Sequence, residues 1–166
     1  VEQCIRIYKA GADYVRIAVP SIKDIEYLSQ IKKTLRSRGF KFPLIADVHF
    51  NPDIAELAAE VVEKVRINPG NFGVRSRSHN DVSTEYSYEE EILHVRDKLK
   101  KLIEICKKNG TAIRIGVNHG SLSQRIMNKY GDTPEGMIES AIEFIRLCEE
   151  ENFHNIVISL KSSNTR

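Results

Sequence analysis

Five short segments of this chain alternate apolar residues with charged or hydrogen-bonding ones. They cover residues 14–19, 44–49, 64–68, 113–118 and 156–161. Successive side chains of a β-strand point to opposite faces, so each segment is expected to form a strand with one apolar and one polar face. Helical patterns separate the segments, which favours parallel βα units whose apolar faces lie under the helices.

The polar face of this predicted sheet collects the residues that carry chemistry. Its members are Arg16, Asp47, His49, Arg66, Asn68, Arg114, Asn118, Ser159 and Lys161. Three arginines and a lysine that face one interior are costly unless an anion meets them. The pattern therefore predicts a binding site for a phosphorylated ligand.

The size and charge of the chain narrow the class of protein. Its 166 residues suffice for a single domain, 1–166, with its own core. The net charge of +2 gives no bulk basicity for nucleic acid, and the apolar runs are too short to cross a membrane. The three cysteines, Cys4, Cys106 and Cys148, form no C-x-x-C pair. We expect them to be free and buried, in a reducing cytoplasm, with no metal held by this chain.

Residues typical of helix ends divide the chain into an alternating order of helices and strands. Helices are expected at 1–11, 21–38, 52–62, 87–109, 121–129 and 133–152. Asn51 and Pro52 suit the start of the third helix. Ser21 and Asp24 resemble a capping box at the start of the second. The polar segment 72–88 is long for a connection, and a solvated loop or insertion point is preferred there over a lid that closes on the phosphate.

Asp47 and His49 end the second predicted strand, at the edge where ligands meet parallel α/β sheets. His49 either donates to a phosphate oxygen or acts as an acid or base. The structural alternative is an imidazole satisfied by the helix cap Asn51, and the neighbouring cations favour the functional interpretation. Two roles stay open for Asp47: catalysis, or an ion pair that holds one of the arginines in place.

Segments 66–71 and 114–121 repeat one arrangement, with an Arg inside the strand, an Asn at its exit and a Gly-containing turn beyond. The planar guanidinium group suits phosphate, and Asn bonds hydroxyl or phosphate oxygens. Gly120 permits close approach of the backbone, and Ser121 can open a helix whose N-terminus attracts anions. His119 is expected to be a loop residue, with ligand contact as the alternative.

These segments resemble the 4-hydroxy-3-methylbut-2-enyl diphosphate synthases of the non-mevalonate isoprenoid pathway. The resemblance is carried by LIADVHF at 44–50, VRINPGN at 65–71, IRIGVNHGSL at 113–122 and SLKSSN at 159–164. The long fourth connection and His119 are similar to the three-domain form of the family. The resemblance implies a TIM-type (β/α) barrel, of which this chain would form a part with about five parallel strands.

The family resemblance also implies a substrate, 2-C-methyl-D-erythritol 2,4-cyclodiphosphate, bound at the mouth of the barrel. The matching ligands of the diphosphate are Arg16, His49, Arg66, Arg114, Asn118, Lys161 and Ser163, to which the strand pattern adds Asn68. A 4Fe-4S cluster in a separate C-terminal domain, absent from this chain, would use two electrons from ferredoxin or flavodoxin for reductive ring opening. The fragment alone is expected to be inactive, with open sheet edges that favour a homo-oligomer.

Two other functions fit the same residues. One is another phosphate-binding TIM-barrel enzyme, such as a pteroate-synthase-like transferase, for which the sequence offers no pterin-binding side chains. The other is a non-catalytic anion-binding module. In each case the diphosphate site is the shared feature, and a catalytic role within this chain is open only for Asp47 and His49.

Overall fold

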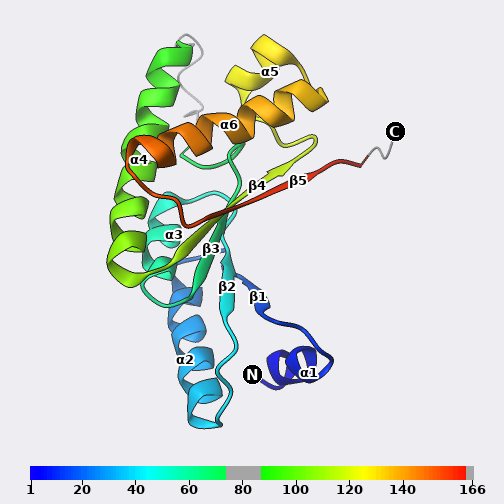
Figure 1. Ribbon diagram of the computed structural model, residues 1–166, viewed down its shortest axis with the longest axis vertical. Helices are drawn as coiled ribbons and strands as arrows, with labels where there is room; N and C mark the ends of the chain where they lie inside the picture. The colour runs from blue at the N-terminus through cyan, green and yellow to red at the C-terminus, as the bar shows by residue number, and fades with distance from the viewer. Residues whose placement is uncertain (74–86, 164–166) are drawn as a thin grey trace.

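The computed structural model describes residues 1–73 and 87–163, and within these ranges five parallel strands form one sheet (Figure 1). The strands are β1 (Val15–Ala18), β2 (Leu44–Asp47), β3 (Lys64–Ile67), β4 (Ala112–Asn118) and β5 (Ile156–Lys161). They lie side by side in chain order, and each neighbouring pair is parallel. The predicted α/β class with parallel βα units is confirmed.

Six helices alternate with the strands in the described ranges. They are α1 (Glu2–Lys9), α2 (Lys23–Ser37), α3 (Pro52–Ala59), α4 (Tyr88–Asn109), α5 (Gln124–Tyr130) and α6 (Pro134–Glu150). Helices α2, α3, α4 and α6 line one side of the sheet, whereas α1 lies apart from them near β1 (Figure 1). Because all neighbouring strands are parallel, the carboxyl ends of all five lie at one edge of the sheet.

The helix starts follow the capping residues with one exception. Asn51 accepts a hydrogen bond from the backbone N–H of Asp53 at 2.9 Å, and Pro52 occupies the first turn of α3, as predicted. At α2 half of the predicted capping box forms, because the backbone N–H of Ser21 donates to the Asp24 carboxylate at 2.9 Å. The other half is wrong: the Ser21 hydroxyl donates to the same carboxylate at 2.6 Å instead of accepting from a backbone N–H, and α2 begins only at Lys23.

The core lies between the sheet and the helices that line it. Its largest fully buried side chains include Leu28, Leu35, Leu44, Leu99, Leu102, Ile103, Ile113, Ile115 and Phe144. All three cysteines are free and buried, as expected. Burial raises the pKa of the Cys106 and Cys148 thiols to about 12, so both behave as small apolar side chains.

The two end strands of the sheet differ from its centre. Every residue of β2 is buried, whereas Ile158 and Leu160 on the apolar face of β5 are each 47% exposed. Ile156 at the start of β5 packs against the core, so the expectation that each apolar face lies under helices is wrong for the rest of β5. The reason is that β5 ends the sheet, with β4 as its paired neighbour.

The long connection before α4 falls largely outside the described residues, which omit 74–86 and with them the candidate lid 75–80. At its near end Phe72 is buried, with its ring 6.0 Å from that of Phe144. At its far end Ser87 and Glu90 form a reciprocal capping box that starts α4. In the described ranges no helix is both long enough and apolar enough to span a bilayer.

Candidate functional site

The predicted polar residues do gather at the carboxyl ends of the strands. Asp47 on β2 is level with Arg66 on β3, and Arg66 is level with Arg114 on β4. Four residues further along β4, Asn118 is level with Lys161 on β5. The parallel register thus brings residues that are distant in sequence into two rows, with the row of Gly116 and Ser159 between them.

Asp47 is the acceptor at the centre of this cluster. Its Oδ1 accepts from Arg66 Nη1 at 3.1 Å and lies 3.4 Å from His49 Nε2, and its Oδ2 lies 3.4 Å from Arg16 Nη1. The Asp47 side chain is only 10% exposed, whereas those of Arg16 and His49 are 45% and 49% exposed. Of the two roles left open by the sequence, the geometry favours the ion pair that holds the arginines.

Arg66 is buried inside the cluster, with its side chain 4% exposed. One guanidinium nitrogen donates to Asp47 and the other donates to the backbone carbonyl of Gly116 at 2.8 Å. A buried arginine needs such partners, because an unpaired charge away from water is costly. Arg66 therefore supports the site from beneath with most of its surface covered by protein.

Arg114 and Lys161 lie closer to solvent. Arg114 is half-buried and its Nε donates to the Ser159 hydroxyl at 3.1 Å, which connects β4 to β5. Lys161 is exposed, yet desolvation and then the positive charges of Arg16, Arg114 and Arg66 lower its pKa below the usual lysine value. The cations therefore repel one another, and an anion between them would relieve that repulsion.

Asn68 and the turn that follows it connect the segment after β3 to the segment after β4. Its Nδ2 donates to Ser121 Oγ at 2.9 Å, and its Oδ1 accepts from Gly70 N–H at 3.2 Å. A Cβ on Gly70 would lie 1.7 Å from the carbonyl oxygen of Ser121, so only glycine fits there. Asn68 is 2% exposed and its amide is engaged by the protein, which suits a supporting role.

The turn after β4 differs from its prediction. Ser121 does not open a helix, because its hydroxyl accepts from Asn68 and α5 starts only at Gln124. His119 lies between two groups that sequence reasoning left unconnected: its Nδ1 is 3.2 Å from Ser163 Oγ, and its Nε2 is 3.5 Å from Asp132 Oδ1. Asp132 carried no recognisable motif and was missed.

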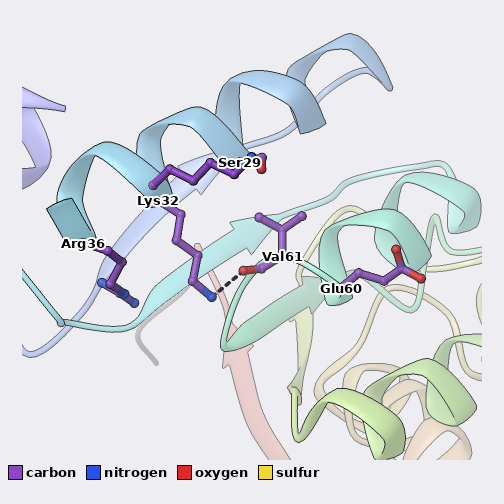
Figure 2. A pocket seen from close by; sticks show the side chains of 6 residues that line it. Ser29, Lys32, Arg36, Glu60 and Val61 are labelled. Carbon is purple, nitrogen blue, oxygen red and sulfur yellow. Dashed lines mark hydrogen bonds between the residues drawn. The ribbon is translucent and has the colours of Figure 1, made fainter.

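A groove lies between α2 and the end of α3, away from the strand-end cluster. This groove of about 420 Å³ is lined by Ser29, Lys32, Lys33, Arg36, Glu60 and Val61 (Figure 2). Lys32 Nζ donates to the Val61 carbonyl at 2.6 Å and pairs with Glu63 at 2.9 Å, and Arg36 also pairs with Glu63. These cations are engaged in fastening α2 to the sheet, so the groove is a structural junction.

The glutamate of that junction is held in its charged form. Burial of Glu63 opposes ionisation, but hydrogen bonds from Leu44 N–H and Lys32, with the charges of Lys32 and Arg36, lower its pKa overall. Glu63 is therefore a charged carboxylate that already pairs with Lys32 and Arg36 of the groove. The strand-end cluster has one central carboxylate for several cations and is the stronger candidate for binding an anion.

The cysteines of this chain do not fit an iron–sulfur cluster. Each is buried in the core, two have raised thiol pKa values, and such a cluster requires thiolates that converge. In the ranges that the structure describes, no three side chains of the metal-binding types come together.

Fold and site together define a class: a parallel βα domain of the barrel type, with a cluster of cations at the carboxyl ends of its strands. Comparison with known families agrees with that class. Residues 1–166 match the GcpE TIM-barrel domain, and the chain belongs to this family. Membership excludes the pteroate-synthase-like alternative.

Similar proteins carry one recurrent name. The chain is 53% identical over 166 residues to 4-hydroxy-3-methylbut-2-en-1-yl diphosphate synthase (flavodoxin) of Bacteroides thetaiotaomicron, covering 99% of the chain and 27% of that protein. It is 47% identical over 165 residues to the chloroplastic ferredoxin-type synthase of Oryza sativa subsp. japonica, covering 99% and 22%. The chain therefore spans about a quarter of the length of these curated relatives.

Solved structures share the fold at low sequence identity. L-ribulose 3-epimerase superposes with a TM-score of 0.55 at 13% identity, over 96% of this chain and 53% of that one. Methylaspartate ammonia lyase from Clostridium tetanomorphum superposes with a TM-score of 0.51 at 14% identity, over 90% and 29%. These likenesses concern the arrangement of strands and helices alone.

Proposed function

We propose that this chain is the diphosphate-binding part of a 4-hydroxy-3-methylbut-2-enyl diphosphate synthase, an oxidoreductase of isoprenoid biosynthesis. The family match over the whole chain and the names of its relatives support this assignment. The observation that carries the binding role is the cluster of Arg16, Arg66, Arg114 and Lys161 near the central carboxylate of Asp47. The proposed ligand is 2-C-methyl-D-erythritol 2,4-cyclodiphosphate.

The cluster divides into residues that meet the ligand and residues that hold them. Side chains with solvent access supply the donors to the diphosphate: Arg16, His49, Arg114, Asn118, Lys161 and Ser163. Buried Arg66 and Asn68 hold the strand ends in place from below. Charge-assisted hydrogen bonds from several directions fix both the position and the orientation of a diphosphate. In this proposal the chain binds and orients its substrate.

Redox chemistry belongs to other parts of the synthase, because the cysteines here do not fit a cluster. The names of the relatives indicate flavodoxin or ferredoxin as the electron donor, and we propose the same for the complete protein. Three unpaired, buried cysteines suit a reducing compartment such as the cytoplasm.

Calorimetric titration of this chain tests the proposal, with the cyclodiphosphate and inorganic pyrophosphate in parallel. We expect the cyclic ligand to bind more tightly, and Arg114→Ala to weaken its binding about tenfold or more, since hydrogen bonds to charged groups are lost. Arg114→Lys should weaken it as well, because the planar fork disappears. Lys33→Ala is the matched control, since it removes one positive charge at the exposed face of the α2–α3 groove.

The outcomes separate the candidate functions. Equal affinity of the wild-type and Arg114→Ala chains would remove the strand-end cluster from the binding site. Binding of both anions without preference for the cyclic ligand would favour a non-catalytic anion-binding module. No binding by a chain that circular dichroism shows to be folded would contradict diphosphate binding by this part, while leaving its family membership unaffected.

A further inference from the structure

A histidine in the turn after β4 joins three segments of the chain. The backbone N–H of His119 donates to the Lys161 carbonyl at 2.8 Å. Its Nδ1 lies 3.2 Å from Ser163 Oγ, and its Nε2 lies 3.5 Å from Oδ1 of Asp132, in the turn between α5 and α6. The side chain of His119 is 29% exposed. The imidazole therefore bridges the end of β5 and the α5–α6 turn.

The turn that supplies Asp132 is itself fixed. The same Oδ1 accepts from the backbone N–H of Gly120 at 3.3 Å. The hydroxyl of Thr133 donates to the Tyr130 carbonyl at 3.0 Å and accepts from Gly136 N–H at 3.1 Å, which caps α6. The carboxylate beside Nε2 is thus held in place by its own backbone surroundings.

The protonation state of the imidazole decides what the Ser163 hydroxyl can do. A hydroxyl carries one proton and two lone pairs. If Nδ1 of His119 has no proton, Ser163 gives its own proton to Nδ1 and has none left for a phosphate oxygen. If Nδ1 carries a proton, it donates to Ser163 Oγ, and the hydroxyl proton is free for an anion.

A neutral imidazole cannot donate to both of its neighbours. It has one N–H, which goes either to the Asp132 carboxylate or to Ser163, whereas the imidazolium donates to both at once. The charged groups on the segments that His119 contacts are Asp132, whose Oδ1 lies 3.5 Å from Nε2, and Lys161, whose carbonyl accepts from the His119 backbone N–H. A bound diphosphate adds negative charge, which favours a cation beside it.

We propose that His119, as an imidazolium held by Asp132, is a positioning residue that turns the Ser163 hydroxyl into a donor to the diphosphate. This inference rests on the proposed function, because it needs an anion at the ends of β4 and β5. In this role His119 and Asp132 act on the ligand through Ser163 and do not contact it themselves.

The test is the affinity of this chain for inorganic pyrophosphate, measured by calorimetry from about pH 5.5 to pH 8, where histidines titrate. In His119→Asn the amide nitrogen lies near the position of Nδ1 and donates at every pH. We expect His119→Asn to match the wild type at the acidic end and to bind more tightly at the alkaline end. Because pyrophosphate itself titrates in this range, the measured quantity is the ratio of the two affinities, which should change several-fold.

Two further variants tie the effect to Ser163. Ser163→Ala should weaken binding about tenfold at acidic pH, because the donor is lost. His119→Ala should weaken it less, because the Ser163 hydroxyl keeps its proton and loses only the group that orients it, and in a Ser163→Ala background His119→Ala should cost nothing more. His154→Ala, at an exposed histidine before β5, should leave the pH profile unchanged. If the His119→Ala chain does not fold, the His119→Asn ratio and Ser163→Ala carry the test.

The results distinguish this inference from the proposed function. If Arg114→Ala weakens pyrophosphate binding but the ratio of wild-type to His119→Asn affinities is flat with pH, the role of His119 is wrong and the diphosphate site stands. Additive losses in the double variant would likewise overturn it. If Arg114→Ala binds pyrophosphate as the wild type does, the diphosphate site itself is wrong and the role of His119 falls with it.

Discussion

The guanidinium of Arg66 lies directly against the backbone of Gly116 on the neighbouring strand. Arg66 Nη2 donates to the Gly116 carbonyl at 2.8 Å, and a Cβ built on Gly116 would lie 2.5 Å from Arg66 Nε. No real side chain tolerates that approach, so a glycine in the middle of β4 has a steric cause. The candidate site thus depends on the absence of a side chain at Gly116 as well as on its charged residues.

Replacement of that glycine should disturb the arginine. In Gly116→Ala the new methyl group displaces Arg66 from Asp47, and we expect the free energy of unfolding to fall by about 1–3 kcal/mol, as in other overpacked cores. Urea denaturation measures the loss. In an Arg66→Ala background the same substitution should cost much less, because the space is then free. Equal costs in the two backgrounds would contradict the steric explanation.

The Asp47 carboxylate should contribute more to the stability of the free protein than to that of the pyrophosphate complex. Asp47→Asn leaves buried Arg66 without a charged partner, and we expect a loss of about 1–3 kcal/mol in stability. A bound anion replaces the missing charge, so pyrophosphate should raise the melting temperature of Asp47→Asn more than that of the wild type. Asp53→Asn, at a 61% exposed carboxylate, is the control. Equal shifts in all three chains would exclude a shared electrostatic role.

Much of this architecture follows from short-range patterns. Alternation of apolar and polar residues locates all five strands, because the side-chain period of a strand is written in consecutive residues. Asn51 with Pro52 predicts the start of α3 for the same reason. The row of Asp47, Arg66 and Arg114 also follows, since parallel strands place their carboxyl ends together.

Most features that the patterns miss depend on contacts between distant residues. The helix at Ser121 fails because Asn68, 53 residues away, engages that side chain. The capping box at Ser21 is a local exception, because its hydroxyl donates to the Asp24 carboxylate instead of accepting from the backbone. Asp132 joins the candidate site only through the fold of the α5–α6 turn. The exposure of Leu160 follows from the position of β5 at the end of the sheet, which alternation does not encode.

A buried ion pair between Arg125 and Glu143, which no sequence motif predicts, connects α5 to α6. Arg125 Nε and Nη2 donate to Glu143 Oε2 at 3.2 and 2.8 Å, and the hydroxyl of Tyr88 on α4 donates to Oε1 of the same carboxylate. The Arg125 and Glu143 side chains are 3% and 8% exposed. Burial, together with this hydrogen bond to Glu143, raises the pKa of Tyr88, so the phenol stays a donor.

Breaking this pair on one side should be costly. Glu143→Gln leaves the buried Arg125 guanidinium with only the longer ion pair to Glu91, 3.9 Å from Nη1, and we expect the free energy of unfolding to fall by about 3 kcal/mol in urea denaturation. Replacing both partners by Met should cost less than Glu143→Gln alone, because no buried charge remains. Glu150→Gln, in an exposed pair with Arg96, should change stability by less than about 1 kcal/mol. A double replacement worse than the single one would show that the pair itself is stabilising.

Ligand binding should also be linked to a proton on Lys161. In the free chain, desolvation and the charges of Arg16, Arg114 and Arg66 lower the pKa of Lys161, so the neutral amine forms at a less alkaline pH than in an ordinary lysine. A diphosphate supplies negative charge, which restores the ammonium form. Binding should therefore take up protons in that range, and affinity should fall as the pH rises through the lowered pKa.

Calorimetry in two buffers of different ionisation enthalpy measures this uptake, because the apparent binding enthalpy then differs between the buffers by an amount proportional to the protons taken up. Lys161→Arg is the matched variant, since a guanidinium keeps the positive charge and does not titrate. Pyrophosphate contributes its own protonation equally to both chains, so the difference between the wild type and Lys161→Arg isolates the lysine. We expect this difference to be positive at alkaline pH and to vanish near neutrality. Identical proton uptake by the two chains at alkaline pH would place Lys161 outside the charge cluster that receives the anion.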